Sequence, residues 1–386
     1  MATTNTPSTL ASRLKERYPK GPSQIVPNST ELRKRITFKK DCQPGELVRF
    51  DVQLTHEHGF STGQGEITLN GATAQESAKA EVEGFSVILQ SKCSYDLITR
   101  AKDSKNAFSE FNTKNFIPMV ESMQKRCEVL DMGYGRQGLG TVLTASGSGV
   151  FIISTNSWCA ALWSGMKGQT LEAFTDVAAQ TQHDGDVVIS AVDIAAKTIT
   201  VTGTSTAIVA GDIFFYEGNA LQGPYGLTDI AVNAGTLYNI SAATYELWAA
   251  QSYDVGTSAL TLGKLLEAAA KSADMGCDEK LTVLVPTATF AGLVSDESAL
   301  TRHGASRSKT NGADKLTFYG PTGEMEIVPY KFIKDGEFVM FPERYTYRIG
   351  SSDIVNRLKN GDIHFDLEST SAVEMRLFTE YTIFCE

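Results

Sequence analysis

The sequence predicts a mixed α+β fold, in which strands and amphipathic helices follow one another without a repeating unit. Near residues 48–54 apolar and polar residues alternate, which is the period of a strand with one buried face. Near residues 116–130 apolar residues recur at steps of three and four, which is the period of a helix with one buried face. Since no period of roughly 20 to 50 residues is visible, a solenoid or a propeller is not expected.

The length and composition fit a globular protein with more than one compact unit. The chain has 386 residues, and 42% of them are hydrophobic, which is enough to fill sizeable cores. The N-terminus has no apolar run typical of a signal peptide, and no later window holds about 18 consecutive apolar residues. The six cysteines are scattered without a CxxC pair, which is typical of reduced thiols. We therefore expect a protein that folds in a cytoplasm, with no membrane span, disulfide framework or zinc site.

Positive charge is concentrated at the N-terminus. Residues 1–40 carry nine basic and two acidic residues, a net charge of +7, whereas the whole chain carries −10, so the remainder carries −17. A basic arm on an acidic body can bind a neighbouring subunit or a polyanion, and the alternative is a solvated tail. The basic residues expected to make contacts are Arg13, Lys15, Arg17, Lys20, Arg33, Lys34, Arg35, Lys39 and Lys40.

A long hairpin is expected after the arm. The glycine-rich stretch HEHGFSTGQG (56–65) follows the first strand, and residues 66–69 provide a return strand. A strand pair alone is marginally stable in water, so such a hairpin is expected to rest on another surface, often that of another subunit. The apolar face of its first strand consists of Val48, Phe50, Val52 and Leu54.

A long helix is the next strong prediction, after a strand at 82–91. Pro118 lies in its first turn, where a missing N–H costs little, and Gly133 ends it. The polar face of the helix includes Glu128. Short strands at 140–144 and 149–154 and a helical turn within SWCAALW follow. The buried face of the helix is formed by Phe116, Val120, Met123, Cys127 and Leu130.

The second half of the chain returns mainly to strands. Residues 187–218 hold three short apolar runs, VVISAVD, KTITVTG and DIFFYEG, which predict a small antiparallel β element. We then expect helices at 241–251 and 258–275, a buried strand at 281–286, and a hairpin that turns at Gly320-Pro321-Thr322-Gly323.

Three short motifs suggest chemistry, but their context argues against each. Residues 59–63 match the G-x-S-x-G nucleophile elbow around Ser61, yet the helix that this motif requires does not follow. Residues 133–138 match G-x-G-x-x-G, yet they follow a helix and lead into strands, which is the reverse of a dinucleotide site. Residues 56–58 (HEH) have no cluster of Cys, His or Asp nearby to complete a metal shell. We therefore expect a protein that is not an enzyme, with no cofactor and no metal site.

The order of these elements resembles that of the major capsid proteins of tailed bacteriophages, which have the Hong Kong 97-like fold. The resemblance covers nearly the whole chain and is collinear along it. The similar stretches are ESMQKRCEVLDMGYGRQGLG (121–140), AALWSGMKGQTLEAFT (160–175), IVAGDIFFYEGN (208–219), TVLVPTATFAGL (282–293) and LTFYGPTGEMEIVPYKFIKDGEFVMFP (316–342).

The resemblance implies a division of the chain and a set of interface residues. The parts are an N-arm (1–45), an extended loop (46–91), a spine helix with the first part of a peripheral domain (92–175), a β-rich insertion or axial-domain elaboration (176–225), an axial domain (226–315), and return strands of both domains (316–386). The extended loop is expected to cover a neighbouring subunit through Val48, Phe50, Val52, Leu54, Phe60, Ile67 and Leu69.

The implied function is self-assembly as hexamers and pentamers into an icosahedral shell around double-stranded DNA, bound without sequence specificity. The implied partners are copies of the same chain, a portal and, because the arm is short, a separate scaffolding protein. Assembly would take place in the host bacterial cytoplasm, and the final location would be the virion. Some relatives cross-link through a lysine of the extended loop, but residues 47–78 contain no lysine, so noncovalent stabilisation is expected. The alternatives are a decoration or tail protein, a secreted glycan-binding β protein, and a hydrolase using Ser61.

Overall fold

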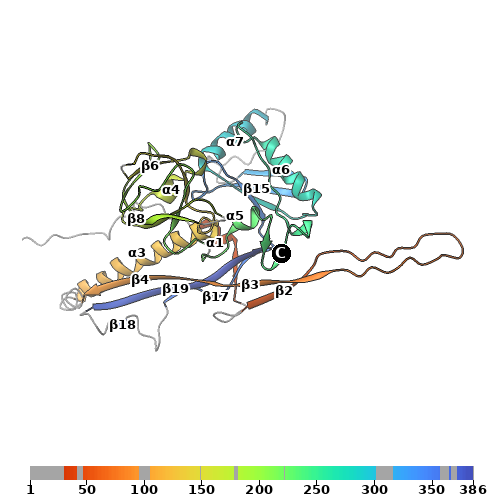
Figure 1. Ribbon diagram of the computed structural model, residues 1–386, viewed down its shortest axis with the longest axis horizontal. Helices are drawn as coiled ribbons and strands as arrows, with labels where there is room; N and C mark the ends of the chain where they lie inside the picture. The colour runs from red at the N-terminus through yellow and green to blue at the C-terminus, as the bar shows by residue number, and fades with distance from the viewer. Residues whose placement is uncertain are drawn as a thin grey trace, which may run out of the picture.

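The computed structural model describes residues 30–40, 47–94, 105–147, 149–177, 181–220, 222–300, 316–356, 365–366 and 372–385. They form a mixed α+β fold, as predicted. Figure 1 shows a closed barrel and a smaller sheet with two helices above a long, narrow sheet, from which a hairpin projects far beyond the rest of the chain. None of the helices in these ranges is long and apolar enough to cross a membrane.

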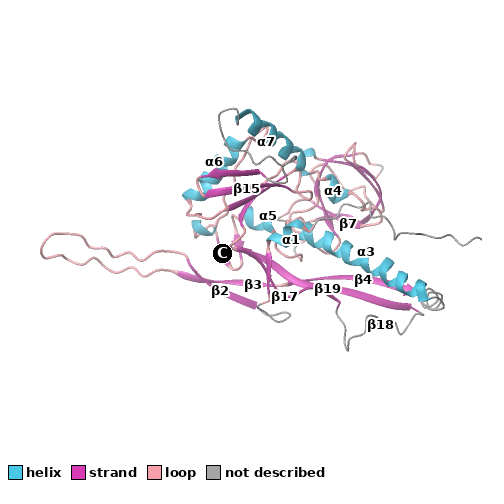
Figure 2. Cartoon of the chain, turned by 180° about the vertical axis from the view of Figure 1, so that it is seen from behind, coloured by secondary structure: helices cyan, strands magenta, loops and turns pink. Residues whose placement is uncertain are grey.

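The long sheet runs along the base of the molecule. Its strand order is β1 (Thr37–Lys39), β17 (Thr346–Asn356), β19 (Ala372–Cys385) and β4 (Phe85–Ser94), with β18 (Phe365–Asp366) beside the start of β19. Only β1 with β17 is a parallel pair in this sheet as described. Helix α3 (Lys105–Asp131) lies along β4 and β19 in both views (Figures 1 and 2). Their shared core cluster contains Met119, Met123, Cys127, Met375, Leu377 and Tyr381.

The long helix was predicted correctly at its C-terminal end and wrongly at its start. It begins at Lys105, so Pro118 lies inside the helix and not in its first turn. The residues before Phe116 are mostly polar, and without an apolar period nothing in them predicted the first turns of the helix. Gly133 ends the helix with φ +99°, a conformation that favours glycine.

The barrel follows the helix directly. Its strand order is β10 (Ile213–Tyr216), β5 (Gly140–Ala145), β6 (Val150–Ile153), β9 (Thr198–Thr202), β8 (Gln182–Asp193) and β7 (Thr170–Phe174), all antiparallel and closed by the pairing of β7 with β10. A 3-10 turn, η1 (Thr155–Ser157), and α4 (Ala160–Trp163) cover one end. Alternate residues such as Phe151 and Phe214 point inward and fill the interior.

The barrel corrects the predicted organisation of residues 176–225. The three apolar runs are strands, as expected, but they do not form a sheet of their own, because β10 pairs with β5 and β7 and not with β9. The expected boundary between 175 and 176 falls between β7 and β8, which are paired strands. Residues 140–216 therefore form one closed unit.

The mixed sheet has the order β14 (Leu316–Gly320), β15 (Gly323–Pro329), β13 (Leu281–Val285) and β16 (Val339–Pro342). Helices α6 (Leu262–Asp274) and α7 (Thr287–Leu300) pack on one face with Val283 and Ile327, while Leu284 and Val328 on the other face join the core shared with the barrel. The predictions of α6, the buried strand β13 and the turn between Gly320 and Gly323 are confirmed.

The predicted helix at 241–251 is wrong. After α5 (Leu227–Ala231), the chain forms two short paired strands, β11 (Thr236–Leu237) and β12 (Ile240–Ser241), and a 3-10 turn, η2 (Glu246–Trp248). Tyr238 and Asn239 have φ values of 51° and 68°, which turn the chain sharply between the two strands. The apolar residues of this segment pack on the base of the hairpin rather than along a helix face.

Candidate functional site

The projecting hairpin is formed by β2 (Leu47–Gln53) and β3 (Ser77–Glu83), paired in register from Leu47 with Glu83 to Gln53 with Ser77. Beyond the strands, residues 54–76 form an extended loop in which His58 and Thr73 make an isolated bridge. The return strand therefore starts at Ser77, and the prediction of a strand at 66–69 is wrong. The alternating residues of that stretch have no apolar surface to pack on in the part of the chain that the structure describes.

The base of the hairpin packs on its own chain. Phe50 stacks on Phe384 of β19, with ring centroids 4.7 Å apart and planes at 15°, and also contacts Tyr347 of β17 edge to face. Val48 and Val52 are partly buried in the same cluster. Leu54 is buried there too. The apolar face expected to cover a neighbouring subunit is thus largely occupied within the subunit.

The end of the loop, by contrast, exposes large apolar side chains. Phe60 is 83% exposed and Leu69 is 82% exposed, and Ile67 is 44% exposed. The backbone around them is ordered by Asn70, whose N–H donates to Ser61 Oγ (2.7 Å) and whose Nδ2 donates to Phe60 O (2.8 Å). Because solvent-exposed apolar groups gain free energy when a second surface covers them, these three side chains are the clearest candidate contacts on the hairpin.

The motifs near this loop do not form a reactive site. Ser61 lies in the loop and not on a strand-to-helix turn, so the nucleophile-elbow geometry is missing. The side chains of His56, Glu57 and His58 are exposed. Across the residues with described positions, no group of three or more His, Cys, Asp or Glu side chains could hold a metal ion.

The nine basic residues expected to make contacts have three different outcomes. Arg13, Lys15, Arg17 and Lys20 fall outside the described residues. The side chains of Lys34, Lys39 and Lys40 are exposed, with Lys39 Nζ 3.3 Å from the centre of the Tyr347 ring. Arg33 and Arg35, in α1 (Glu31–Arg35), bind carboxylates of the same chain. For these two arginines the expected contact with a neighbour or with DNA is replaced by contacts within the subunit.

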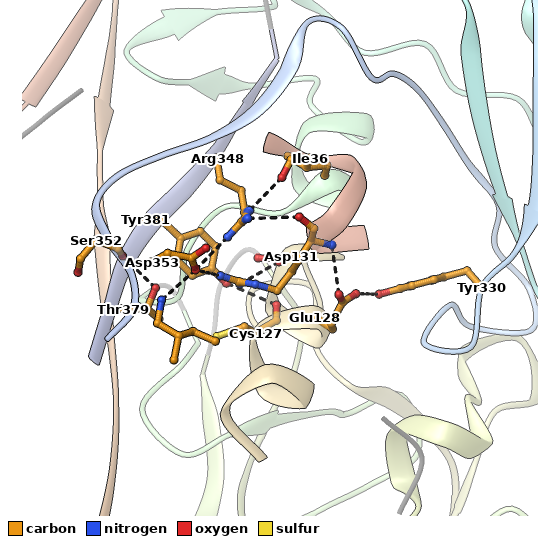
Figure 3. Close-up of polar contacts among 12 residues, drawn as sticks. Ile36, Cys127, Glu128, Asp131, Tyr330, Arg348, Ser352, Asp353, Thr379 and Tyr381 are labelled. Carbon is orange, nitrogen blue, oxygen red and sulfur yellow. Dashed lines mark hydrogen bonds and ion pairs between the residues drawn. The ribbon is translucent and has the colours of Figure 1, made fainter. Parts of the chain in front are cut away.

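Arg33 is the centre of a buried polar cluster. Figure 3 shows this cluster, with Glu128, Asp131 and Arg348 among the labelled residues. Its guanidinium binds Asp131 Oδ2 of α3 at 3.1 Å and Asp353 Oδ1 of β17 at 2.5 Å. Its backbone N–H donates to Glu128 Oε1 (3.1 Å), and Glu128 Oε2 accepts from the Tyr330 hydroxyl (2.5 Å). With a side chain only 7% exposed, Arg33 supplies a cation where acidic groups are shielded from water.

Arg348 of β17 adds the second cation of this cluster. Its guanidinium donates to the backbone oxygens of Arg33 (3.3 Å) and Ile36 (3.2 Å) and binds Asp353 at 3.2 Å. These bonds satisfy carbonyl groups at the end of α1 that have no partner within the helix. The cluster therefore attaches the N-terminal segment to both α3 and the long sheet.

Burial determines the proton affinity of the acidic groups. Burial raises the pKa of Glu128 to about 7, with a further contribution from the Asp131 charge, and it also raises the pKa of Asp131. Burial acts in the same direction on Asp353, but the charges of Arg33 and Arg348 outweigh it and hold the pKa of Asp353 below its usual value. Charge compensation in the cluster is uneven, because Asp131 and Asp353 each form an ion pair with Arg33, whereas Glu128 accepts hydrogen bonds from the Arg33 backbone N–H and the Tyr330 hydroxyl.

The sequence did not reveal this cluster. Glu128 was expected on the polar face of the helix, but it is fully buried, because α1, the barrel and the mixed sheet surround the last turns of α3. The only signal was the residue run 127–132, CEVLDM, in which apolar residues occupy nearly all sides of the helix.

A cavity of about 580 Å³ lies between the mixed sheet, α6 and the segment from α5 to η2. Apolar and polar groups line it, among them Trp248 of η2, Met275 just after α6, Met340 of β16 and Cys385 of β19. Its lining includes two carboxylates, Asp278 and Glu279, and Glu279 Oε1 binds the Arg344 guanidinium at 2.5 Å.

Comparisons with known proteins give a match in structure. No protein-family model matches the sequence. A comparison with curated protein sequences finds no match either. A chain of the cyanophage A-1(L) capsid asymmetric unit is similar in structure, with a TM-score of 0.55 and 10% identity, over 99% of this chain and 96% of that one.

Two further solved structures give weaker likenesses. The capsid of a native GTA particle has a TM-score of 0.48 at 9% identity, with 100% of this chain and 96% of that chain covered. A structure from Mycobacterium phage Bobi has a TM-score of 0.46 at 10% identity, with 99% and 93% covered. The match to the cyanophage chain shows that this chain has the fold of a phage capsid protein, as the resemblance in sequence implied.

Proposed function

We propose that this chain is the major capsid protein of a tailed phage, and that many copies assemble as hexamers and pentamers into an icosahedral shell around double-stranded DNA. The observation that carries the proposal is the fold shared with a capsid chain over nearly the full length of both. The same reading includes a scaffolding protein and a portal as partners, assembly in the host cytoplasm and a final location in the virion.

The exposed loop end supports self-assembly. Phe60 and Leu69 belong to the loop 54–76, which projects far from the body of the chain (Figure 1), and no other described part of the subunit covers their side chains. Burial of each side chain on a neighbouring copy contributes about 1.5–3 kcal/mol. In this proposal the end of the loop, rather than the base of the hairpin, provides the apolar contact between subunits.

Two features argue against the alternatives. A decoration or tail protein is expected to lack a long helix beside an extended sheet, whereas α3 has 27 residues and packs along β4 and β19. A hydrolase using Ser61 would need a base and an oxyanion hole around that hydroxyl, but its described partner is the backbone N–H of Asn70.

Sedimentation velocity over a range of protein concentrations tests the proposal. The double variant Phe60→Ser/Leu69→Ser should raise the concentration needed for assembly by at least about tenfold, since each factor of ten corresponds to about 1.4 kcal/mol. Ile194→Ser is the matched control, because Ile194 is 42% exposed on the barrel. Unchanged assembly in the double variant, or an equal loss in the control, would contradict the proposed loop contact.

A further inference from the structure

The segment from residue 30 to residue 40 contacts several units of the fold at once. Leu32 of α1 and Ile36, which follows the helix, are fully buried in a core cluster that includes side chains of α3, the barrel, the mixed sheet and β19. Immediately after α1, β1 pairs in parallel with β17, from Thr37 with Tyr347 to Lys39 with Ile349. This short segment is therefore held by apolar contacts on one side and by backbone hydrogen bonds on the other.

Arg35 connects the same helix to the mixed sheet. Its guanidinium binds Glu343, just after β16, at 2.7 Å and Glu326 of β15 at 3.1 Å. Both carboxylates have a second partner in the sheet region: Lys280 binds Glu326 at 3.1 Å, and the Thr282 hydroxyl donates to Glu343 at 2.8 Å. Arg35 thus joins an existing charged network rather than a single surface carboxylate.

The two arginines face opposite sides of α1. Two residues along a helix turn by about 200°, so side chains at positions 33 and 35 cannot share a face. Arg33 accordingly reaches α3 and the long sheet, whereas Arg35 reaches the mixed sheet. The helix lies between these two parts of the molecule and binds each through a different residue.

We propose that residues 30–40 form a clasp that couples the long sheet to the mixed sheet. Arg33 binds the long-sheet side and Arg35 binds the mixed-sheet side. Loss of the Arg33 contacts therefore weakens the attachment of α1 to the mixed sheet, and loss of the Arg35 contacts weakens its attachment to the long sheet. The clasp is a property of the single subunit and does not rest on the proposed capsid function.

The Arg33 side and the Arg35 side of the clasp differ in their tolerance of substitution. The Arg33 side chain is 7% exposed, and its removal leaves Asp131, which is fully buried, without its closest cation. The Arg35 side chain is 21% exposed, and Lys280 remains on Glu326 after its removal. Arg35→Gln is therefore the variant expected to fold and to report on coupling alone.

Hydrogen exchange measured by mass spectrometry tests the clasp, with variant and wild type compared in the same assembly state. In Arg35→Gln, hydrogen exchange should accelerate about fivefold or more in α1 and also in residues 349–353 of β17, which Arg35 does not contact. A factor of about five is the lower end of the range of thermodynamic coupling between linked sites. Lys34→Gln is the matched control, because Lys34 is exposed and lies between the two arginines. Acceleration confined to α1 and the mixed sheet would overturn the proposal.

The reciprocal variant gives a second readout, since thermodynamic coupling acts equally in both directions. Arg33→Gln should accelerate exchange around Glu326 and Glu343, although Arg33 contacts neither. Normal exchange there in a folded Arg33→Gln protein would overturn the clasp. If that variant does not fold, the Arg35→Gln measurement decides the question alone.

Discussion

Replacement of Glu128 by glutamine should make the protein increasingly more stable than the wild type as the pH rises. Glu128 is fully buried, and burial raises the pKa of its carboxyl from 4.5 to about 7. Because the folded-state pKa is raised, the folded protein binds this proton more tightly than the unfolded chain does. The stabilisation from the proton is complete below pH 4.5 and is lost as the pH rises toward 7.

The size of the effect follows from the two pKa values. With 4.5 for the unfolded chain and about 7 for the folded protein, the wild type loses about 2 to 3 kcal/mol between about pH 5 and about pH 8 through this one group. Glutamine has nearly the same shape, stays neutral throughout, and can still accept the hydrogen bond from the Arg33 N–H. With an unfolding entropy of about 2.1 cal/mol/K per residue over 386 residues, the difference corresponds to about 3 °C in Tm.

Calorimetry of Glu128→Gln and the wild type at these two pH values provides the assay. The difference in stability between the two proteins should shift toward the variant by about 2 to 3 kcal/mol from the lower to the higher pH. Glu121→Gln is the control, since Glu121 lies on the same helix and is partly exposed. A stability difference that does not change with pH, or one that shifts toward the wild type, would refute the raised pKa of the Glu128 carboxyl.

Two further predictions concern close packing and thiol reactivity. Gly226→Ala should lower the free energy of unfolding, measured with denaturant, by about 3 kcal/mol, because the new Cβ would lie 2.1 Å from the backbone N of Gly133. Gly235→Ala is the control and should be nearly neutral, because its new Cβ would have no atom within 4 Å. Equal effects of the two substitutions would contradict this explanation. Burial raises the pKa of Cys127 to about 12 and that of Cys159 to about 11. Neither thiol should therefore be alkylated in the folded protein at about pH 8, as measured by peptide mass spectrometry. Alkylation at the rate of the unfolded chain would argue against their burial.

The elements that the sequence predicted well are those whose signals are local. The alternation in β2, the uninterrupted apolar run of β13 and the amphipathic pattern of α6 each reflect the surface on which the element packs. The pairing partners of a strand leave no such trace. The closure of the barrel through β10 and β7 joins segments about 40 residues apart, and nothing in either segment specifies the other.

The candidate contacts divide in the same way. The exposed apolar residues Phe60 and Leu69 were expected at a subunit contact because the resemblance to capsid proteins implies one for the extended loop, and that contact stays a prediction. Arg33 and Arg35 were assigned to contacts outside the subunit, because net charge is counted along the sequence without regard to burial. Their partners Asp131 and Glu326 are about 100 and 290 residues away, and only the tertiary fold brings them together.

Electron microscopy of the purified protein tests whether this chain builds a capsid shell. The protein is imaged alone and with a candidate scaffolding protein, at several salt concentrations. We expect closed shells, or rings of five and six subunits. A stable monomer or small dimer under every condition would contradict it.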